Sequence, residues 1–132
     1  MAITQAIANS FKKELLDGAM SFKQTGGDTF KIALYISTAT LTSATSNYIT
    51  AGEVSNTGQY AAGGGALVNL GTSMTAGVAR CDFNDRSFTG VTLTARGALI
   101  YNTTAGSGSS TTDAVCILNF GADKTATSGT FT

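Results

Sequence analysis

Carboxylates that could do acid–base or metal chemistry are few in this sequence. Asp82 and Asp85 stand close enough along the chain to form the carboxylate pair that a glycosidase needs across a cleft. The run from Asp82 to Asp85 also has ligand types that suit Ca²⁺, but without the glycine and the distal glutamate of an EF-hand loop. A solvated turn is therefore the favoured interpretation of this segment.

Histidine does not occur among the 132 residues, so the commonest general base and metal ligand is missing. Neither a Ser-His-Asp nor a Cys-His arrangement can be built. The glycine-rich segments 63–65 and 106–108 have no phosphate-loop lysine and open no helix. Three consecutive glycines at 63–65 instead indicate a bulge or a close backbone approach. We predict that the chain is not an enzyme and has no cofactor or metal.

Charge is scarce and balanced. The chain has eight basic and eight acidic residues, a net charge of zero, and a charged fraction of 12%, which is about half the usual value. No basic excess is present to neutralise phosphates or anionic lipids, so we predict neither nucleic-acid nor membrane partners. Weak self-repulsion suits a protein whose surface is covered by neighbouring subunits.

Side chains suited to protein contacts are easier to find. Arg80, Arg86 and Arg96 are the only arginines, and arginine is a frequent anchor of interfaces. Strand-edge ion pairs with Asp82, Asp85 or Asp113 explain them equally well. Tyr48 and Tyr60 flank loops and could serve an interface or a ligand, although packing in or beside the core is the simpler interpretation.

The elements that position these residues begin with a helix, predicted over about residues 3–22. Ile3, Ile7, Phe11 and Leu15 recur every four residues and so fall on one helical stripe. This stripe needs a partner surface, either the domain's own sheet or a neighbouring subunit. It is our first candidate for a subunit or capsid contact.

The rest of the chain is predicted to be β-structure. Phe30 to Ile36 alternates as a half-buried strand does, and further strand-like runs cover 66–70, 78–83, 88–94, 98–101 and 114–120, with a bend at 96–97. Residues 37–58 predict a long loop, and 103–112 a flexible loop tip. We predict a single domain over residues 1–132: mainly β, an antiparallel β-sandwich or barrel-like domain over about 28–132 with one N-terminal α-helix.

The two cysteines, Cys81 and Cys116, each lie inside one of these apolar runs. The simpler interpretation is that both are buried and free, acting as small apolar side chains. A disulfide between them cannot be deduced from the sequence.

Several segments resemble a group of small tailed-bacteriophage virion proteins. The resemblance spans residues 8 to about 131, and its most specific parts are the runs KKELLDG at 12–18 and RGALIYN at 96–102. The other parts are ANSFKKELLDG at 8–18, DTFKIALY at 28–35, GGGAL at 63–67 and AVCILNFG at 114–121. It implies a non-enzymatic component of a phage particle, and a further strand beyond the position of Phe131. We therefore expect an open sheet edge that a neighbouring subunit could cover.

Composition and resemblance together favour a capsid decoration (cement) protein. Such a subunit would be made in the host bacterial cytoplasm, reside in the virion, and bind the phage major capsid protein or other virion subunits as a homo-oligomer. The alternative is a tail or neck subunit (tube, adaptor or tip) that assembles through strand edges and the 37–58 loop. A third possibility is a receptor- or carbohydrate-binding module with Tyr48 and Tyr60 as its platform.

Overall fold

The structure is a computed structural model that describes residues 2–104 and 110–132. The described residues form seven strands and one helix, which follow one another as β1 (Ala6–Ile7), α1 (Asn9–Leu16), β2 (Phe30–Tyr35), β3 (Gly65–Ala66), β4 (Asn69–Thr75), β5 (Val78–Phe83), β6 (Phe88–Asn102) and β7 (Asp113–Phe131). The prediction of a mainly β, antiparallel fold with one helix is confirmed. No barrel closes within these two ranges. Part of the predicted 103–112 loop, including the 106–108 glycines, lies outside them.

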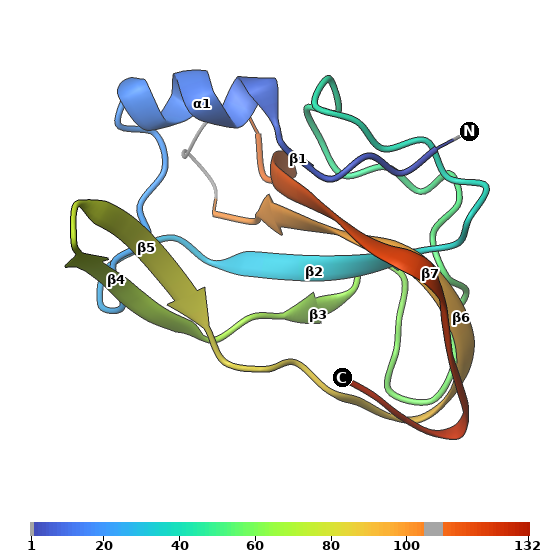
Figure 1. The fold of residues 1–132 in the computed structure, drawn as a ribbon. Helices are drawn as coiled ribbons and strands as arrows, with labels where there is room; N and C mark the ends of the chain where they lie inside the picture. The colour runs from blue at the N-terminus through green and yellow to red at the C-terminus, as the bar shows by residue number, and fades with distance from the viewer. Residues whose placement is uncertain (1, 105–109) are drawn as a thin grey trace.

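One antiparallel sheet organises the fold, in the strand order β1-β7-β6-β2-β3 (Figure 1). The central strand β6 pairs with all six residues of β2 on one side and with β7 on the other. The register with β7 shifts between Ala95 and Gly97. The predicted bend is therefore a bulge inside one long strand, since β6 runs unbroken through it.

The strand predicted at 114–120 is much longer than expected. β7 continues through the polar residues 121–131, which pair with the first half of β6. Most of this second half is exposed, and Ala126 is its one buried residue. Threonine-rich segments of this kind make good strands once a partner ladder is present, because the branched Cβ fits a pleated surface.

The upper face of the sheet in Figure 1 is covered by α1, the N-terminal segment and the loop 37–58. Their buried side chains, such as Ile3 and Leu41, pack with Ala33, Tyr35 and Leu99 from β2 and β6. Val54, near the end of the loop, packs instead in the core cluster on the other face. Phe11 of α1 meets Phe22 edge-on, with ring centroids 5.7 Å apart. Asn47 of the loop donates to the buried carboxylate of Asp113, so the loop is tied to β7. The predicted 37–58 loop therefore acts as a covering layer.

The helix predicted over 3–22 is wrong in extent, because α1 spans only Asn9–Leu16. Ile3 lies instead in a parallel bridge with Leu41, and Ile7 is half-exposed in the short strand β1. Backbone hydrogen bonds to the 37–58 loop and to β7 hold residues 3–8 extended, and Gly18 in the left-handed region follows the helix end. Two of the four spaced residues, Ile3 and Ile7, lie in extended segments, and the other two, Phe11 and Leu15, lie in α1. The predicted stripe is therefore not one surface.

Gly64 confirms the close backbone approach predicted for the three glycines. Its φ is +81°, and a Cβ there would stand 1.9 Å from the carbonyl oxygen of Ile32 on the neighbouring strand β2. No side chain can fit at this position without moving β3 away from β2.

We predict that Gly64→Ala lowers the free energy of unfolding by about 2–4 kcal/mol, because left-handed strain adds to a backbone clash. Urea unfolding followed by circular dichroism would measure it. Gly121→Ala is the matched control, since Gly121 has φ +77° but nothing within 4 Å of the added Cβ. That control should cost only about 1 kcal/mol. Equal costs at the two positions would contradict the crowding at Gly64.

Candidate functional site

A two-stranded hairpin, here called the arm (residues 69–83), stands apart from the main sheet. Its strands β4 and β5 pair with each other, and Thr75↔Val78 leaves Ala76 and Gly77 as the turn. Their φ angles of 51° and 78° are those of a type I′ turn, whose twist matches that of the strands it joins. Local turn chemistry thus favours a tight hairpin between β4 and β5.

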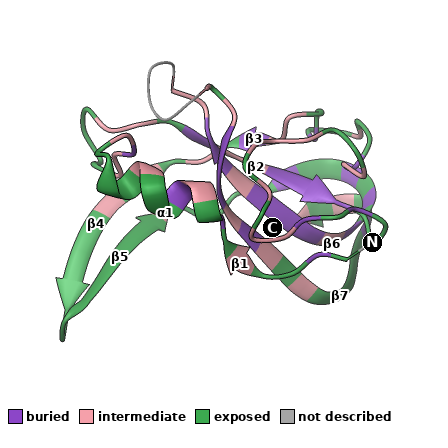
Figure 2. Cartoon of the chain, turned by 90° about the horizontal axis from the view of Figure 1, so that it is seen from above, coloured by how far each residue is buried: buried purple, intermediate pink, exposed green. Residues whose placement is uncertain are grey.

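The arm is anchored at its base and exposed along its length. Phe83 packs against Phe30, with ring centroids 5.5 Å apart, and the amide of Asn84 donates to the carbonyl of Val68. Beyond this base, nearly every arm residue is exposed, and in the described structure β4 and β5 belong to no other sheet. Figure 2 shows the two strands extending away from the body, exposed over most of their length.

Large apolar side chains lie on this exposed arm. Met74 is 74% exposed and Val78 is 51% exposed, and Leu70 and Val68 are exposed nearer the base. Strand alternation and the β4–β5 register place Met74, Ala79 and Cys81 on one face, in line with Phe83. Apolar groups kept in water at a projecting tip are typical of a surface that another molecule covers.

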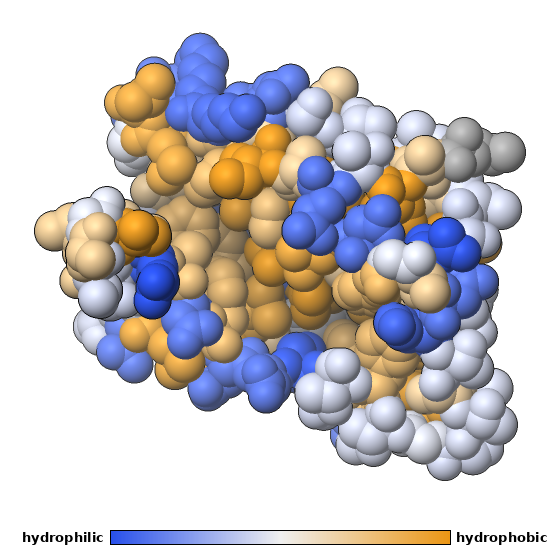
Figure 3. All heavy atoms as spheres, viewed as in Figure 1, coloured by the Kyte–Doolittle hydropathy of each residue, from blue (hydrophilic) through white to orange (hydrophobic). Residues whose placement is uncertain are grey.

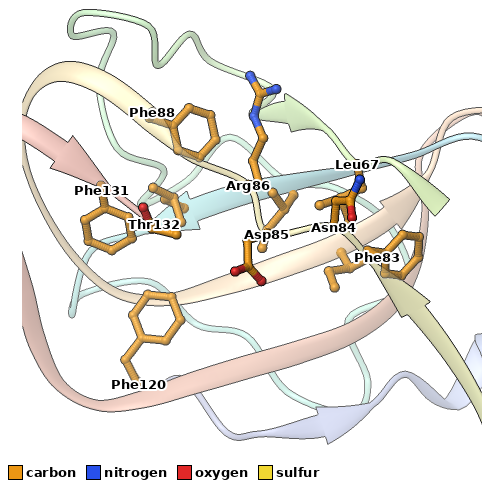
Figure 4. Close-up of a pocket in the computed structure, with 12 residues that line it drawn as sticks. Leu67, Phe83, Asn84, Asp85, Arg86, Phe88, Phe120, Phe131 and Thr132 are labelled. Atoms are coloured by element: carbon orange, nitrogen blue, oxygen red, sulfur yellow. The ribbon is translucent and has the colours of Figure 1, made fainter. Parts of the chain in front are cut away.

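The lower face of the main sheet is left open as an apolar groove. The groove has a volume of about 440 Å³. Its floor is formed by Ile32, Leu34 and Ile100, from β2 and β6, and four rings stand around it: Phe83, Phe88, Phe120 and Phe131. Figure 3 shows the same face as a hydrophobic hollow, and Figure 4 shows the rings around it. Within residues 2–104 and 110–132, no segment covers the groove in the way that α1 and the 37–58 loop cover the other side.

Charged groups mark the rim of this groove. Asp85 and Arg86 lie on the segment that joins β5 to β6. The Arg86 guanidinium sits 5.0 Å from the centroid of the Phe88 ring and extends away from the groove in Figure 4. Both residues are exposed, and neither has an ion-pair partner in the described ranges. The rim can therefore offer one charge of each sign to a partner.

The outer edge of β7 is also open. β1 pairs with only Cys116 and Ile117, whereas residues 124–131 pair with β6, with register shifts, on one side and with no described strand on the other. A long unpaired edge is a template for another strand.

Tyr48 and Tyr60, predicted to serve an interface or be packed, meet at the carboxylate of Glu53. Both hydroxyls donate to it, and the amide of Gly63 donates to it over 2.7 Å. The Tyr60 hydroxyl also accepts from the amide of Leu34 at 2.8 Å. Tyr60 is only 1% exposed. The structure thus places it in the core, where its hydrogen bonds tie residues 53–63 to β2.

Tyr48 lies at the border of the same cluster. Its ring stacks on Tyr101 with centroids 5.0 Å apart, and the Tyr101 hydroxyl donates to the carbonyl of Gly63. Burial and the neighbouring Glu53 carboxylate raise the pKa of Tyr48 well above its ordinary value, and burial does the same to the pKa of Tyr60. Tyr35 joins the same group, since its hydroxyl donates to the carbonyl of Ile49 and lies near the Glu53 carboxylate. We call the four tyrosines and Glu53 the tyrosine cluster (Tyr35, Tyr48, Glu53, Tyr60 and Tyr101).

The three arginines do not converge. Arg80 is exposed on the arm, and Arg86 stands at the groove rim. Arg96 pairs with Asp123 across β6 and β7 at 2.7 Å, on the surface of the sheet. An ion pair was predicted as one option for the arginines, but Asp123 was not among the expected partners.

Of the predicted helical stripe, Ile3 and Phe11 are buried in the core, whereas Ile7 and Leu15 are about half exposed. The stripe therefore offers two separate side chains to solvent rather than a face.

Sequence reasoning missed the arm and the groove. The strand at 78–83 was predicted, but its exposure was not: Cys81 is exposed, and Cys116 is half-buried. Both thiols are free, and burial raises the pKa of Cys116 to about 11. The one sequence signal for the arm was the short Ala76-Gly77 turn between apolar residues. Such a turn indicates a hairpin, but it does not show whether the hairpin is exposed or buried.

The described residues include no cluster of three or more potential metal ligands, and no helix among them is long and apolar enough to cross a membrane. No family model, curated protein or solved structure matches the chain. The arm, the groove and the β7 edge are therefore judged on their own geometry.

The tyrosine cluster makes the protein's stability depend on alkaline pH. Burial raises the pKa values of Tyr35, Tyr48 and Tyr60, so in the folded chain they keep protons that the unfolded chain releases near pH 10. Stability should begin to fall above about pH 9, where the unfolded chain releases the Cys116 proton, and fall more steeply above about pH 10, by up to about 1.4 kcal/mol per pH unit for each of Tyr35 and Tyr60. The contribution of Tyr48 is smaller, because solvent screens its less buried hydroxyl. Urea unfolding at pH 9 and pH 11 would measure the loss.

Tyr60→Phe tests the same cluster by mutation. It removes the donor to Glu53 and leaves the buried Leu34 amide without its acceptor, so we expect a loss of about 1–3 kcal/mol at neutral pH. The variant has one fewer tyrosine with a raised pKa, so its stability should fall less steeply between pH 9 and pH 11. An unchanged alkaline slope would contradict the role given to Tyr60.

Proposed function

We propose that this chain is a non-enzymatic structural subunit of a tailed-bacteriophage particle, and that it decorates the capsid as a cement protein. Its partners would be the major capsid protein and further copies of itself. The segments that resemble phage virion proteins support this, and so do the low and balanced charge and the three open surfaces of the fold.

The exposed arm is the main structural observation that supports this proposal. A monomer that works alone gains nothing from holding Met74 and Val78 in water on a hairpin that packs only at its base. In an assembly the same side chains become buried, and each copy then gains about 1.5–3 kcal/mol for each large apolar side chain covered. Small gains repeated over many copies favour a stable shell.

A tail or neck subunit is the second candidate, and the free edge of β7 favours it. An edge of this length could receive a strand from the next copy and so build a ring or a tube. The carbohydrate-binding alternative has less support, because Tyr60 is buried and Tyr48 is held by Glu53 and Tyr101, so the two rings form no exposed platform.

The number of copies per particle distinguishes these proposals. We expect hundreds of copies, measured by quantitative mass spectrometry of purified particles against the major capsid protein, and we expect them to remain with isolated heads. Hundreds of copies found only on tails would favour the tail-tube alternative. About a dozen copies or fewer would exclude a cement protein, and none would exclude a virion subunit altogether.

Incorporation of variants would test the arm itself. Phe11→Asp is unsuitable, because Phe11 is buried against Phe22 and the change would unfold the chain. Met74→Asp changes an exposed arm residue and should reduce incorporation at least about tenfold. Leu16→Asp is the control, since Leu16 is 90% exposed on α1 and should leave incorporation unchanged. Equal incorporation of both variants would contradict a role for the arm.

A further inference from the structure

We propose that the apolar groove beneath β2 and β6 binds a small organic ammonium ion with an apolar body, and that Asp85 and the surrounding rings hold its charged group. This ligand site goes beyond the proposed function and does not depend on it. It combines a carboxylate that extends into the groove with four phenylalanine rings and an apolar floor (Figure 4).

Asp85 supplies the charge inside the groove. Its carboxylate extends toward the space among the rings in Figure 4, whereas the Arg86 guanidinium extends in the opposite direction. In residues 2–104 and 110–132, the Asp85 carboxylate takes part in no ion pair and no hydrogen bond. A carboxylate without a partner beside an apolar surface is suited to pair with a cation that brings apolar area of its own.

Arg86 does not offer a competing charge to the groove. Its guanidinium lies 5.0 Å from the centroid of the Phe88 ring. Its side chain also packs against Gly65 of β3, where an added Cβ would stand 2.5 Å from the Arg86 Nε atom. These contacts hold the guanidinium against β3, so the charge directed at a molecule in the groove is the negative charge of Asp85.

The rings around the groove favour the same kind of ligand. The centroids of Phe120 and Phe131 are 6.2 Å apart, with the two rings tilted by 42°, and Phe83 and Phe88 also line the groove. The face of an aromatic ring carries partial negative charge and attracts an ammonium group within about 6 Å of its centroid. A neutral ligand gains only the apolar contact, and an anion is disfavoured by both the ring faces and Asp85.

The size of the groove suits a small ligand. Ile32, Leu34 and Ile100 give an apolar floor, and the volume of about 440 Å³ lies within the range of pockets that enclose small molecules. Such pockets are mostly apolar, with a few polar groups that orient the ligand. Protein interfaces instead spread over about 800 Å² per partner. The ligand therefore places its apolar body on the floor and its ammonium group beside Asp85.

Titration of the isotope-labelled full chain, followed by amide NMR, is the experiment. Three probes share a phenyl-alkyl body of similar length and differ in charge: phenylbutylammonium, phenylbutanol and phenylbutyrate. We expect saturable shifts at the amides of Ile32 and Ile100, and about tenfold higher affinity for the ammonium than for the alcohol, because an exposed ion pair and a cation–π contact each contribute a few-fold. Phenylbutyrate should bind most weakly.

Substitution of Asp85 separates charge recognition from apolar binding. Asp85→Asn keeps the size of an exposed side chain and removes its charge, so it should lower the ammonium affinity at least about threefold and leave the alcohol affinity unchanged. Asp17→Asn is the matched control and should change neither affinity, because Asp17 is exposed at the end of α1, on the covered side of the sheet. Phe120→Leu keeps an apolar wall without a ring and should weaken the ammonium more than the alcohol. The amide spectra also show whether each variant is folded.

Four results would overturn the inference. One is a lack of saturable shifts up to about 10 mM of the ammonium probe. Another is equal affinity for the ammonium and the alcohol, and a third is a preference for the ammonium that Asp85→Asn leaves unchanged. The fourth is tighter binding of acetyl-lysine-methylamide than of phenylbutylammonium, which would mean that a lysine side chain of a protein partner occupies the groove. None of these results changes the copy number in particles, so the proposed function stands or falls separately.

Discussion

The structure depends above all on the pairing of β6 with β2 and β7 at once. Residues 98 and 99 of β6 are fully buried and point to opposite faces, so one strand carries the packing of both sides of the sheet. The helix side is closed by α1 and the 37–58 loop. On the opposite face of the sheet, no described segment covers the part next to the arm, and this uncovered part is the groove. One alternating strand thus determines both the core and the exposed apolar face.

The tyrosine cluster explains how a covering layer poor in large apolar residues stays in place. Residues 37–58 are rich in serine and threonine and bury few large apolar side chains. Glu53 compensates by accepting from two tyrosine hydroxyls and from the Gly63 amide, while Asn47 reaches the buried Asp113. Hydrogen bonds to a charged group are stronger than neutral ones. Polar anchoring, rather than apolar area, therefore positions this layer.

The fold and the proposed assembly would use different parts of the chain. The buried side chains that hold the fold lie along β2, β6 and the first half of β7, whereas the arm, the groove rim and the outer edge of β7 contribute little to it. If the chain assembles as proposed, it could therefore fold before it associates. Its sparse charge is consistent with this division, because surfaces that become buried between subunits lose less when they carry few ions.

Local features could be predicted from the amino-acid order alone: the mainly β class, the strand Phe30–Tyr35, the crowded glycine at 64 and the lack of any histidine for an active site. These follow from alternation, backbone sterics and residue type, which act over a few neighbours. It took the three-dimensional packing to establish that Ile3 joins the 37–58 loop, that Tyr60 is buried on Glu53, and that Met74 stays in water. Spacing shows which residues share a side of an element. It does not show whether anything covers that side, because burial depends on segments far away in the sequence.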